Sequence, residues 1–337
     1  MQMSELVRTG AACLLAAVLA AGCVSSSTVR GSSAESTAPV GGGTETGFSR
    51  PERTPAEETG PFVPPTPVGP IASPGDVAEP MPGGVIDWSG RVVRSRGTGV
   101  LDPGNTNKAQ ARLMAERAAT VVAQRNLLEI IKGVRVDSET KVQNYMTEYD
   151  VIYSRVDGIV KGARQLGPAK YDSLAGTVEV ELEVAMYGDS SVGSVLEPVL
   201  GGGGSGDFSA SSVSPQVREF LRQYSGILLD AGTSGLKPAM YPKIFDSNGN
   251  LLLDTRDYIG KTGAPGAYAM QFVQKLDDVL ARPEFANSPL VLKVRQVTGR
   301  LGTDIILGNE DAGKLKWLKD SFKYLAAAGR FILKLAL

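Results

Sequence analysis

Glu179, Glu181 and Glu183 form a dense set of side chains that could do acid–base or metal chemistry. Every second residue from Val178 to Met186 is apolar, and this alternation predicts a strand with one buried and one wet face. Residues two apart on a strand share a face, so the three carboxylates line up. They could form a carboxylate site, but charged side chains on a wet face also discourage edge pairing. We favour the solvated face.

The segment Asp246-Ser-Asn248-Gly-Asn250 carries oxygen ligands at a spacing similar to the start of a calcium loop. An EF-hand needs glycine at the sixth position and glutamate at the twelfth, where this sequence has Leu251 and Asp257. The central Asn-Gly instead suits the two positive φ angles of a type I′ turn. We therefore predict a hairpin turn without a metal.

Gly232 and Gly235 lie in the glycine-rich segment 231–238, which follows a predicted strand. A phosphate cradle would need a helix to begin directly after the loop, and no helix start follows. The segment is better explained as a turn that lets the chain pass close to a neighbour.

Four lysines, Lys314, Lys316, Lys319 and Lys323, are interleaved with apolar residues in a predicted helix over 310–328. A basic amphipathic helix can lie on an anionic membrane. An ordinary domain helix with a wet basic face has the same pattern, and lysines toward its C-terminal end suit the helix dipole. We favour core packing for this helix.

The sequence contains no histidine. Ser-His-Asp and Cys-His nucleophile systems are therefore excluded, as are zinc sites with imidazole ligands, whereas carboxylate or lysine chemistry stays open. With 35 basic and 36 acidic residues the net charge is −1, which gives no electrostatic case for a nucleic-acid partner. We expect a protein that is not an enzyme and holds no cofactor and no metal.

The N-terminal segment has the features of an export signal. A leader with Arg8 precedes an apolar run over 11–21, which is too short to span a bilayer. The run ends in Leu19-Ala-Ala-Gly-Cys23, which resembles the bacterial lipobox, although that motif usually has leucine where Ala20 stands. An ordinary secretory signal would instead leave Cys23 as a free thiol. We predict a signal peptide over 1–22 and lipidation of Cys23, with palmitate among the acyl chains.

The composition divides the rest of the chain into four parts. Residues 23–82 hold 11 of the 20 prolines and are predicted to be a lipidated, disordered tether, although a low-complexity insertion without a role has the same composition. A first α+β domain is predicted over 83–187 and a second over 215–337. A Gly/Ser-rich linker over 188–214 joins them.

In the first domain we predict a strand over 85–100, interrupted at Gly90, and a helix capped by Asn105 or Asn107 that runs to Lys132. The core face of this helix is predicted to carry apolar residues at helical spacing: Met114, Ala118, Val121, Leu128 and Ile131. An extended segment, a helix and two strands are predicted to follow, over 134–142, 144–156, 158–171 and 177–187.

In the second domain the predicted strands are 226–231, a hairpin of 240–245 with 250–254, then 290–297, 303–307 and 330–337. The predicted helices are 267–281 and 310–328, the latter capped by Asn309. We expect the final strand to be an exposed sheet edge, because no later element can shield it. The fold class is α+β.

Several stretches resemble the bacterial outer-membrane lipoprotein family that includes the flagellar protein FlgP. The similar segments begin at Ala109, Gly158, Gly226, Gly235 and Thr303, and the strand that ends at Tyr187-Gly188 is similar too. The resemblance implies a protein on the periplasmic face of the outer membrane, and Val24 after the lipidated cysteine agrees with export there. Relatives often assemble into rings around the flagellar motor, although not all are flagellar.

We therefore expect a self-associating structural or assembly scaffold, anchored to lipid through Cys23, with homo-oligomers and flagellar basal-body or cell-wall proteins as partners. The alternative is a periplasmic binding module for peptidoglycan or a small ligand. A binding module should have a concave site with convergent polar groups, whereas a scaffold should have flat or edge surfaces.

Overall fold

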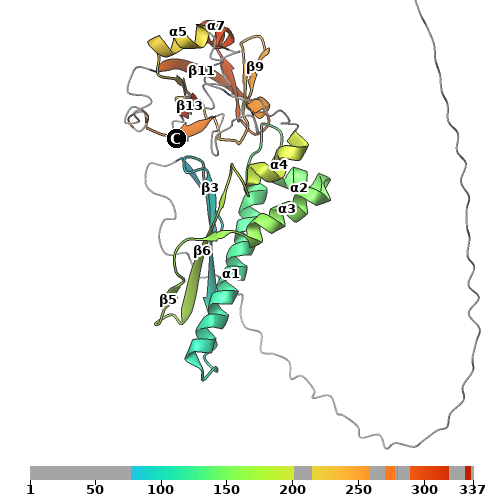
Figure 1. Cartoon of the computed structure of the whole chain (residues 1–337), viewed down its shortest axis with the longest axis vertical. Helices are drawn as coiled ribbons and strands as arrows, with labels where there is room; N and C mark the ends of the chain where they lie inside the picture. The colour runs from blue at the N-terminus through green and yellow to red at the C-terminus, as the bar shows by residue number, and fades with distance from the viewer. Residues whose placement is uncertain are drawn as a thin grey trace, which may run out of the picture. The chain divides into compact units, whose positions relative to one another are not determined.

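The computed structural model describes residues 77–200, 215–258, 270–275, 277, 279, 289–318 and 331–334. They form two sheets with helices around them, so the predicted α+β class is confirmed (Figure 1). We call residues 77–200 the N-terminal module and the described residues from 215 onward the C-terminal module.

The N-terminal module is built on an antiparallel sheet in the order β1-β2-β3-β6-β4, with β5 also paired to β6. Its strands are β1 Ala78–Met81, β2 Gly84–Asp87, β3 Val92–Val100, β4 Arg164–Gln165, β5 Lys170–Asp172 and β6 Thr177–Ala185. The predicted strand over 85–100 is thus a hairpin of β2 and β3. The strand β1 lies within the segment that was predicted to be part of the tether, so this prediction is wrong at its C-terminal end.

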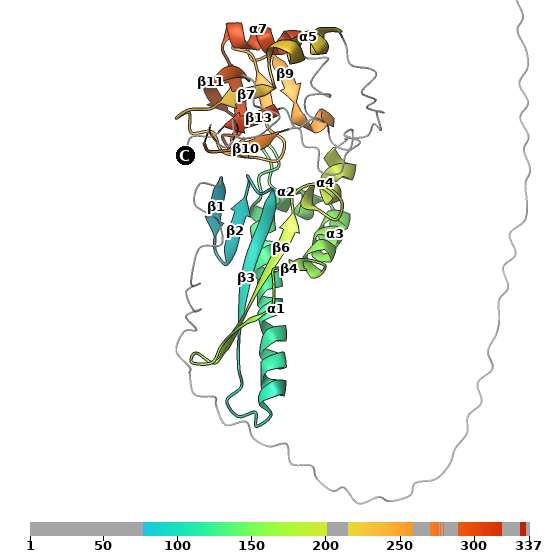
Figure 2. The ribbon, with the colours of Figure 1, turned by 60° about the vertical axis from the view of Figure 1, so that its left-hand side comes forward.

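The helix α1 (Lys108–Gly133) lies along β3 and β6 in both views of the ribbon (Figures 1 and 2). Asn107 is its N-cap, as predicted, and its side chain accepts a hydrogen bond from the N–H of Gln110 at 3.1 Å. Four alanines, one per turn, and then larger residues make its buried face: Ala111, Ala115, Ala119, Ala123, Leu127, Ile130 and Ile131.

The predicted core face of α1 is wrong for its N-terminal half. Met114 and Val121 are more than half exposed, and Ala118 is exposed too. The reason is the close approach of α1 to β3. A Cβ on Gly97 would lie 2.1 Å from the carbonyl oxygen of Ala119. Only glycine on the strand and alanine on the helix leave room for backbones this close, so the larger side chains face outward.

The region between α1 and β6 differs from the prediction. Residues 142–148 and 150–161 form two helices, α2 (Val142–Glu148) and α3 (Asp150–Lys161). The predicted strand over 158–171 is therefore wrong at its start, and only the short β4 and β5 follow. The predicted extended segment 134–142 contains one bridge, between Arg135 and Lys141.

A helix, α4 (Val192–Leu200), lies within the segment predicted as a linker. Its side chains Val192, Val195 and Leu196 are buried in the core, which explains why this stretch is ordered despite its glycine and serine content. The glycine run at 201–204 lies outside the described residues.

The sheet of the C-terminal module has the order β10-β13-β7-β11-β12-β8-β9. Its strands are β7 Ile227–Asp230, β8 Lys243–Phe245, β9 Leu251–Asp254, β10 Gln271–Val273, β11 Leu290–Thr298, β12 Asp304–Leu307 and β13 Phe331–Lys334. The helix α5 (Pro215–Gln223), the 3-10 turn η2 (Thr255–Tyr258) and the helix α7 (Asn309–Trp317) complete the described part. The predicted strands at 226–231, 290–297 and 303–307 are confirmed.

Two predictions about the strands of this module are wrong. Residues 271–273 form the strand β10, although they lie within the predicted helix over 267–281. The final strand β13 exists but is not an edge, because it pairs in parallel with β10 on one side and with β7 on the other. The strand β13 is thus inserted between strands that precede it in the sequence, a pairing that no local pattern encodes.

The two modules share one hydrophobic core and exchange backbone hydrogen bonds. The N–H groups of Met240 and Tyr241 donate to the carbonyls of Arg135 and Val136 at 2.9 and 2.8 Å. The ring of Trp88 packs edge-on against Phe272, with centroids 5.8 Å apart. The side chain of Arg135 completes this junction, since it donates hydrogen bonds to the carbonyl of Pro238 and to the carboxylate of Glu79.

Candidate functional site

The predicted lipidation site, Cys23, lies outside the described residues, as do the signal peptide and most of the predicted tether. No residue that the structure describes belongs to a helix long and apolar enough to cross a bilayer.

The three glutamates of β6 lie in a cross-strand ladder of ion pairs with β3. Arg94 is opposite Glu183 and Arg96 is opposite Glu181 in the register of the two strands. The Nε of Arg94 lies 2.8 Å from Glu183 Oε2, and the Nη2 of Arg96 lies 2.9 Å from Glu181 Oε1. Glu179 also pairs with Arg96, at 3.3 Å.

Further cations complete the ladder, since Arg164 pairs with Glu183 and Lys170 with Glu181. Our prediction of a solvated face for these glutamates is therefore wrong. The Glu183 side chain is only 10% exposed, and that of its neighbour Arg96 is only 6% exposed. Each carboxylate of the ladder is neutralised by cations. The ladder therefore stabilises the sheet and offers no unpaired acid or base.

Burial by itself raises the pKa of Glu183, but hydrogen bonds from Arg94 and Arg164 and their charges outweigh burial and hold the pKa below its usual value. The pKa of Glu181 is lowered in the same way, with burial opposed by Lys170 and Arg96.

Acid is therefore expected to destabilise the N-terminal module. A carboxylate whose pKa is lowered by folding contributes stability above its unfolded-state pKa of about 4.3. That contribution is lost as the pH falls through the folded-state pKa. Urea unfolding between pH 7 and 3 measures this effect. The acid loss of stability should be smaller in Glu183→Gln, and an unchanged pH profile in that variant would contradict the assignment.

The predicted hairpin around Asn248-Gly249 is confirmed as β8–β9, but the turn type is wrong. Gly249 alone has a positive φ, of 82°, and its N–H donates to the carbonyl of Asp246. The Asp246 carboxylate accepts the N–H groups of Asn248 and Asn250 at 2.9 and 2.8 Å. The oxygens that resembled calcium ligands thus cap their own turn. Within the described ranges, no cluster of acidic, histidine or cysteine residues could hold a metal.

The glycine-rich loop after β7 is a turn, with positive φ angles at Gly232 and Gly235. The N–H of Gly232 donates to the Asp230 carboxylate at 3.1 Å. A phosphate would have to compete with that negative charge, so the loop is a poor anion cradle.

The helix α7 packs against the core, as we predicted, through the buried Ala312 and Leu315, and its C-cap residue Leu318 is buried too. Its N-cap is Gly308, not Asn309. Lys314 pairs with Glu310 and Asp311, whereas Lys319 and Lys323 lie outside the described residues.

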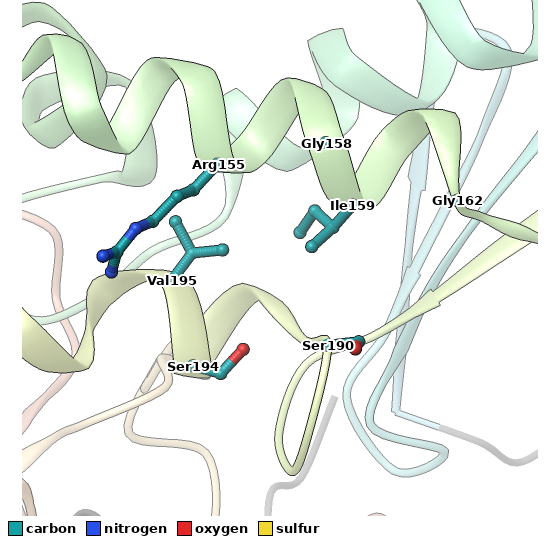
Figure 3. A pocket seen from close by; sticks show the side chains of 7 residues that line it. All are labelled: Arg155, Gly158, Ile159, Gly162, Ser190, Ser194 and Val195. Carbon is teal, nitrogen blue, oxygen red and sulfur yellow. The ribbon is translucent and has the colours of Figure 1, made fainter.

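An open pocket of about 430 Å³ lies between α3 and the start of α4 (Figure 3). Arg155 and Ile159 line its α3 side, and Ser190, Ser194 and Val195 line its α4 side. The Ser194 hydroxyl is engaged in capping α4, because it donates to the carbonyl of Ser191 at 2.8 Å and accepts its N–H at 3.0 Å. Arg155 is the one charged residue of the lining, and the remaining polar side chain besides Ser194 is Ser190, so few polar groups converge on this pocket.

The outer face of α1 is the most distinctive surface of the N-terminal module. Four apolar side chains are exposed there: Leu113 by 59%, Met114 by 54%, Val121 by 57% and Val122 by 39%. Both ribbon views show α2 and α3 beside the C-terminal half of α1 and no described helix beside its N-terminal half (Figures 1 and 2). Clustered exposed apolar residues mark interaction surfaces in soluble domains. We call Leu113, Met114, Ala118, Val121 and Val122 the α1 stripe.

Sequence reasoning missed the α1 stripe because it assigned the larger apolar residues to the core. A signal was present in the alanines at 111, 115, 119 and 123, together with Gly97 and Gly99 on the preceding strand. Small residues at helical spacing facing small residues on a strand indicate a close helix–sheet contact.

Comparison with known proteins adds a similarity for the C-terminal module. No curated protein matches the chain. A family model matches residues 226–333, which span β7 to β13. This part of the chain is similar to the second domain of Tp0624 from Treponema pallidum.

Proposed function

We propose that this chain is a lipoprotein of the outer membrane, anchored through Cys23, and that it faces the periplasm as a self-associating structural or assembly scaffold. An envelope structure such as the flagellar motor is the setting that the sequence resemblance favours. The FlgP-like resemblance and the lipobox-like segment before Cys23 support the location, and the α1 stripe supports the scaffold role.

The α1 stripe is the observation that carries the scaffold role. Exposure of the four large apolar side chains on the solvent side of α1 costs solvation free energy of about 25 cal/mol for each Å² of apolar surface left in water. A second protein surface that covers the stripe recovers this free energy. A scaffold needs such a surface, whereas an enzyme needs convergent reactive groups.

A binding module is less well supported. It would rest on the pocket between α3 and α4, whose Ser194 hydroxyl caps a helix. It would also rest on the loop at Asp246, whose carboxylate is occupied by its own turn.

The Cys23→Ser variant tests both halves of the proposal. Without the lipid, we expect the protein to move from the membrane fraction to the soluble fraction. In that fraction we expect particles larger than one chain, because the α1 stripe does not depend on the anchor. Membrane fractionation and light scattering over a range of concentrations measure the two effects.

The natural chain, expressed and fractionated in parallel, is the control. Recovery of Cys23→Ser in the membrane pellet after a salt wash would contradict the anchor. A mass of one chain at every concentration would contradict self-association, and the binding module would then be the better hypothesis.

A further inference from the structure

We infer that the strand β1 is a releasable strap, through which a pull on the anchored segment of the chain unlocks the junction of the two modules. The segment that begins at Cys23 enters the described structure at Val77, and β1 is the first element after it. The inference rests on the proposed anchor for the source of the pull. The lock itself depends only on the contacts of β1.

The attachment of β1 to the fold is narrow. Among the described strands β1 pairs only with β2, and Figure 2 shows it at the edge of the sheet. Just before β1, the carbonyl of Val77 accepts the N–H of Trp88 at 2.8 Å, and the N–H of Val77 donates to the Ser89 hydroxyl at 2.9 Å. An edge strand is paired on one side only, so β1 can leave without breaking any other pair of described strands.

One side chain of β1 reaches the junction. Glu79 accepts hydrogen bonds from Nη2 and Nη1 of Arg135 at 2.5 and 3.1 Å. The Nε of the same arginine donates to the carbonyl of Pro238 in the C-terminal module at 2.7 Å. Arg135 is only 8% exposed, and a buried charge that loses its partner costs free energy. Departure of Glu79 therefore favours movement of the guanidinium toward water and away from Pro238.

A second route from β1 to the junction runs through Trp88. The indole N–H of Trp88 makes a long hydrogen bond of 3.5 Å to Glu79. The guanidinium of Arg135 lies over the Trp88 ring, and the ring packs edge-on against Phe272 of the C-terminal module. Glu79 thus contacts both of the N-terminal side chains that meet the C-terminal module here. Loss of this one carboxylate from its place acts on both contacts.

Two backbone amides report on the junction. The N–H groups of Met240 and Tyr241 donate to carbonyls of the N-terminal module, and we call them the junction amides. They exchange hydrogen with water when the junction opens. The N–H of Leu290 donates to the carbonyl of Gly226 within the C-terminal module at 2.8 Å, so its exchange reports on that module alone.

Removal of the carboxylate tests the contact. In the full-length Cys23→Ser protein, Glu79→Ala should make the junction amides exchange about ten-fold faster and leave Leu290 unchanged. Glu129→Ala is the matched control, because Glu129 is 63% exposed and pairs with Lys132 on the same helix. It should change the exchange of the junction amides by less than about two-fold. Hydrogen exchange read by mass spectrometry measures these rates.

Release of the strand tests the pairing. Val77 is 2% exposed, so Val77→Glu places a charge at a buried position and should detach β1. A detached β1 carries Glu79 away from Arg135, and the junction amides should again exchange about ten-fold faster. Combined with Glu79→Ala, the effect should be smaller than the product of the two single effects, because both act through the same contact.

A disulfide that fastens β1 to β2 separates the two variants. Pro80 and Val85 are register partners, and their pair is of the non-hydrogen-bonded kind because residues 77 and 88 form a hydrogen-bonded pair three positions away. The Cα atoms of such a pair lie about 4.5 Å apart, within the range of a disulfide. Oxidised Pro80→Cys with Val85→Cys should cancel the effect of Val77→Glu and leave that of Glu79→Ala.

Load between two thiols tests the pull. The chain produced without its signal peptide and without lipid carries a thiol at Cys23, and Val151→Cys adds a second at a 52% exposed position of α3. Optical tweezers attached to both thiols load β1 without pulling on the C-terminal module. The first event should lengthen the chain by on the order of 20 Å, the span of the few residues of the strap. Glu79→Ala should lower the load at which it occurs.

The outcomes are distinguishable. Faster exchange of the junction amides in both variants, cancelled by the disulfide in Val77→Glu alone, supports the strap together with a short first event under load. Unchanged junction amides overturn it, as does equal acceleration at Leu290 or a first event that unfolds the whole N-terminal module. The anchor is decided separately by fractionation of Cys23→Ser, and recovery in the membrane pellet would overturn the pull from the anchor without altering the exchange results.

Discussion

Replacing Gly99 by alanine is expected to lower the free energy of unfolding by about 3 kcal/mol or more, at the upper end of what overpacking costs. A Cβ at this position would lie 1.9 Å from the carbonyl oxygen of Ala115 and 2.9 Å from the backbone nitrogen of Ala119. Both are backbone atoms of α1, so the clash is relieved only by moving the whole helix from the sheet. Urea unfolding followed by circular dichroism measures the loss.

The same substitution at Gly158 is a matched control. Gly158 lies in α3, and a Cβ there would meet no atom within 4 Å. Alanine should therefore stabilise the helix by about 0.5–1 kcal/mol, because glycine in a helix loses more backbone entropy on folding. A Gly99→Ala protein as stable as the natural chain would show that α1 does not pack as closely on β3 as described.

Replacing Arg135 by methionine is expected to weaken the junction of the two modules by about 2–3 kcal/mol, which is less than the roughly 3–5 kcal/mol lost when a fully buried ion pair is broken. The Nε of Arg135 donates to the carbonyl of Pro238 at 2.7 Å, and its Nη1 donates to Glu79 at 3.1 Å. The guanidinium also lies 5.4 Å from the ring centroid of Trp88. The expected loss is smaller than for a fully buried pair because the Glu79 side chain is 38% exposed and water can partly replace its partner.

Limited proteolysis and urea unfolding measure how much Arg135→Met weakens the junction of the two modules. The loss of Arg135 should let the modules separate before either unfolds, so that one transition becomes two. Arg155→Met, at an exposed position of α3, is the control and should change stability by less than about 0.5 kcal/mol. A single transition with an unchanged midpoint in Arg135→Met would contradict the role of this side chain.

A second substitution in the junction separates the contribution of the Arg135–Glu79 ion pair from that of the other contacts of Arg135. The pKa of Glu79 is lowered, because the hydrogen bond and charge of Arg135 outweigh the effect of burial. Glu79→Gln removes the charge that Arg135→Met leaves without its partner. The double variant should therefore lose less stability than the sum of the two single variants.

Local patterns determined several elements of this protein. The alternation from Val178 to Met186 specifies a strand and its buried face, because side chains on a strand point to opposite sides. Asn107 specifies the start of α1, and Asn248-Gly249 specifies the β8–β9 hairpin. The absence of histidine excluded whole classes of catalytic and zinc sites. In each case the physical cause acts within a few residues of the signal.

Contacts between distant residues decided the rest. The charged face of β6 is a ladder and not a wet surface, because Arg94 and Arg96 come from a strand about 90 residues earlier. The last strand β13 is internal because β7 and β10 pair with it from both sides. Hydrophobic periodicity describes one strand at a time and contains no information on which strands pair with it.

The α1 stripe shows most clearly which features the sequence determines and which features depend on tertiary contacts. The sequence determined that α1 is a helix with apolar residues on more than one face. Which face is buried depends on how near the helix comes to the sheet, and Gly97 and Gly99 set that distance from another element. Because only alanine fits at so close a contact, the larger Met114 and Val121 remain in water. The tertiary structure therefore exposes residues that were predicted for the core, and these residues form part of the candidate site.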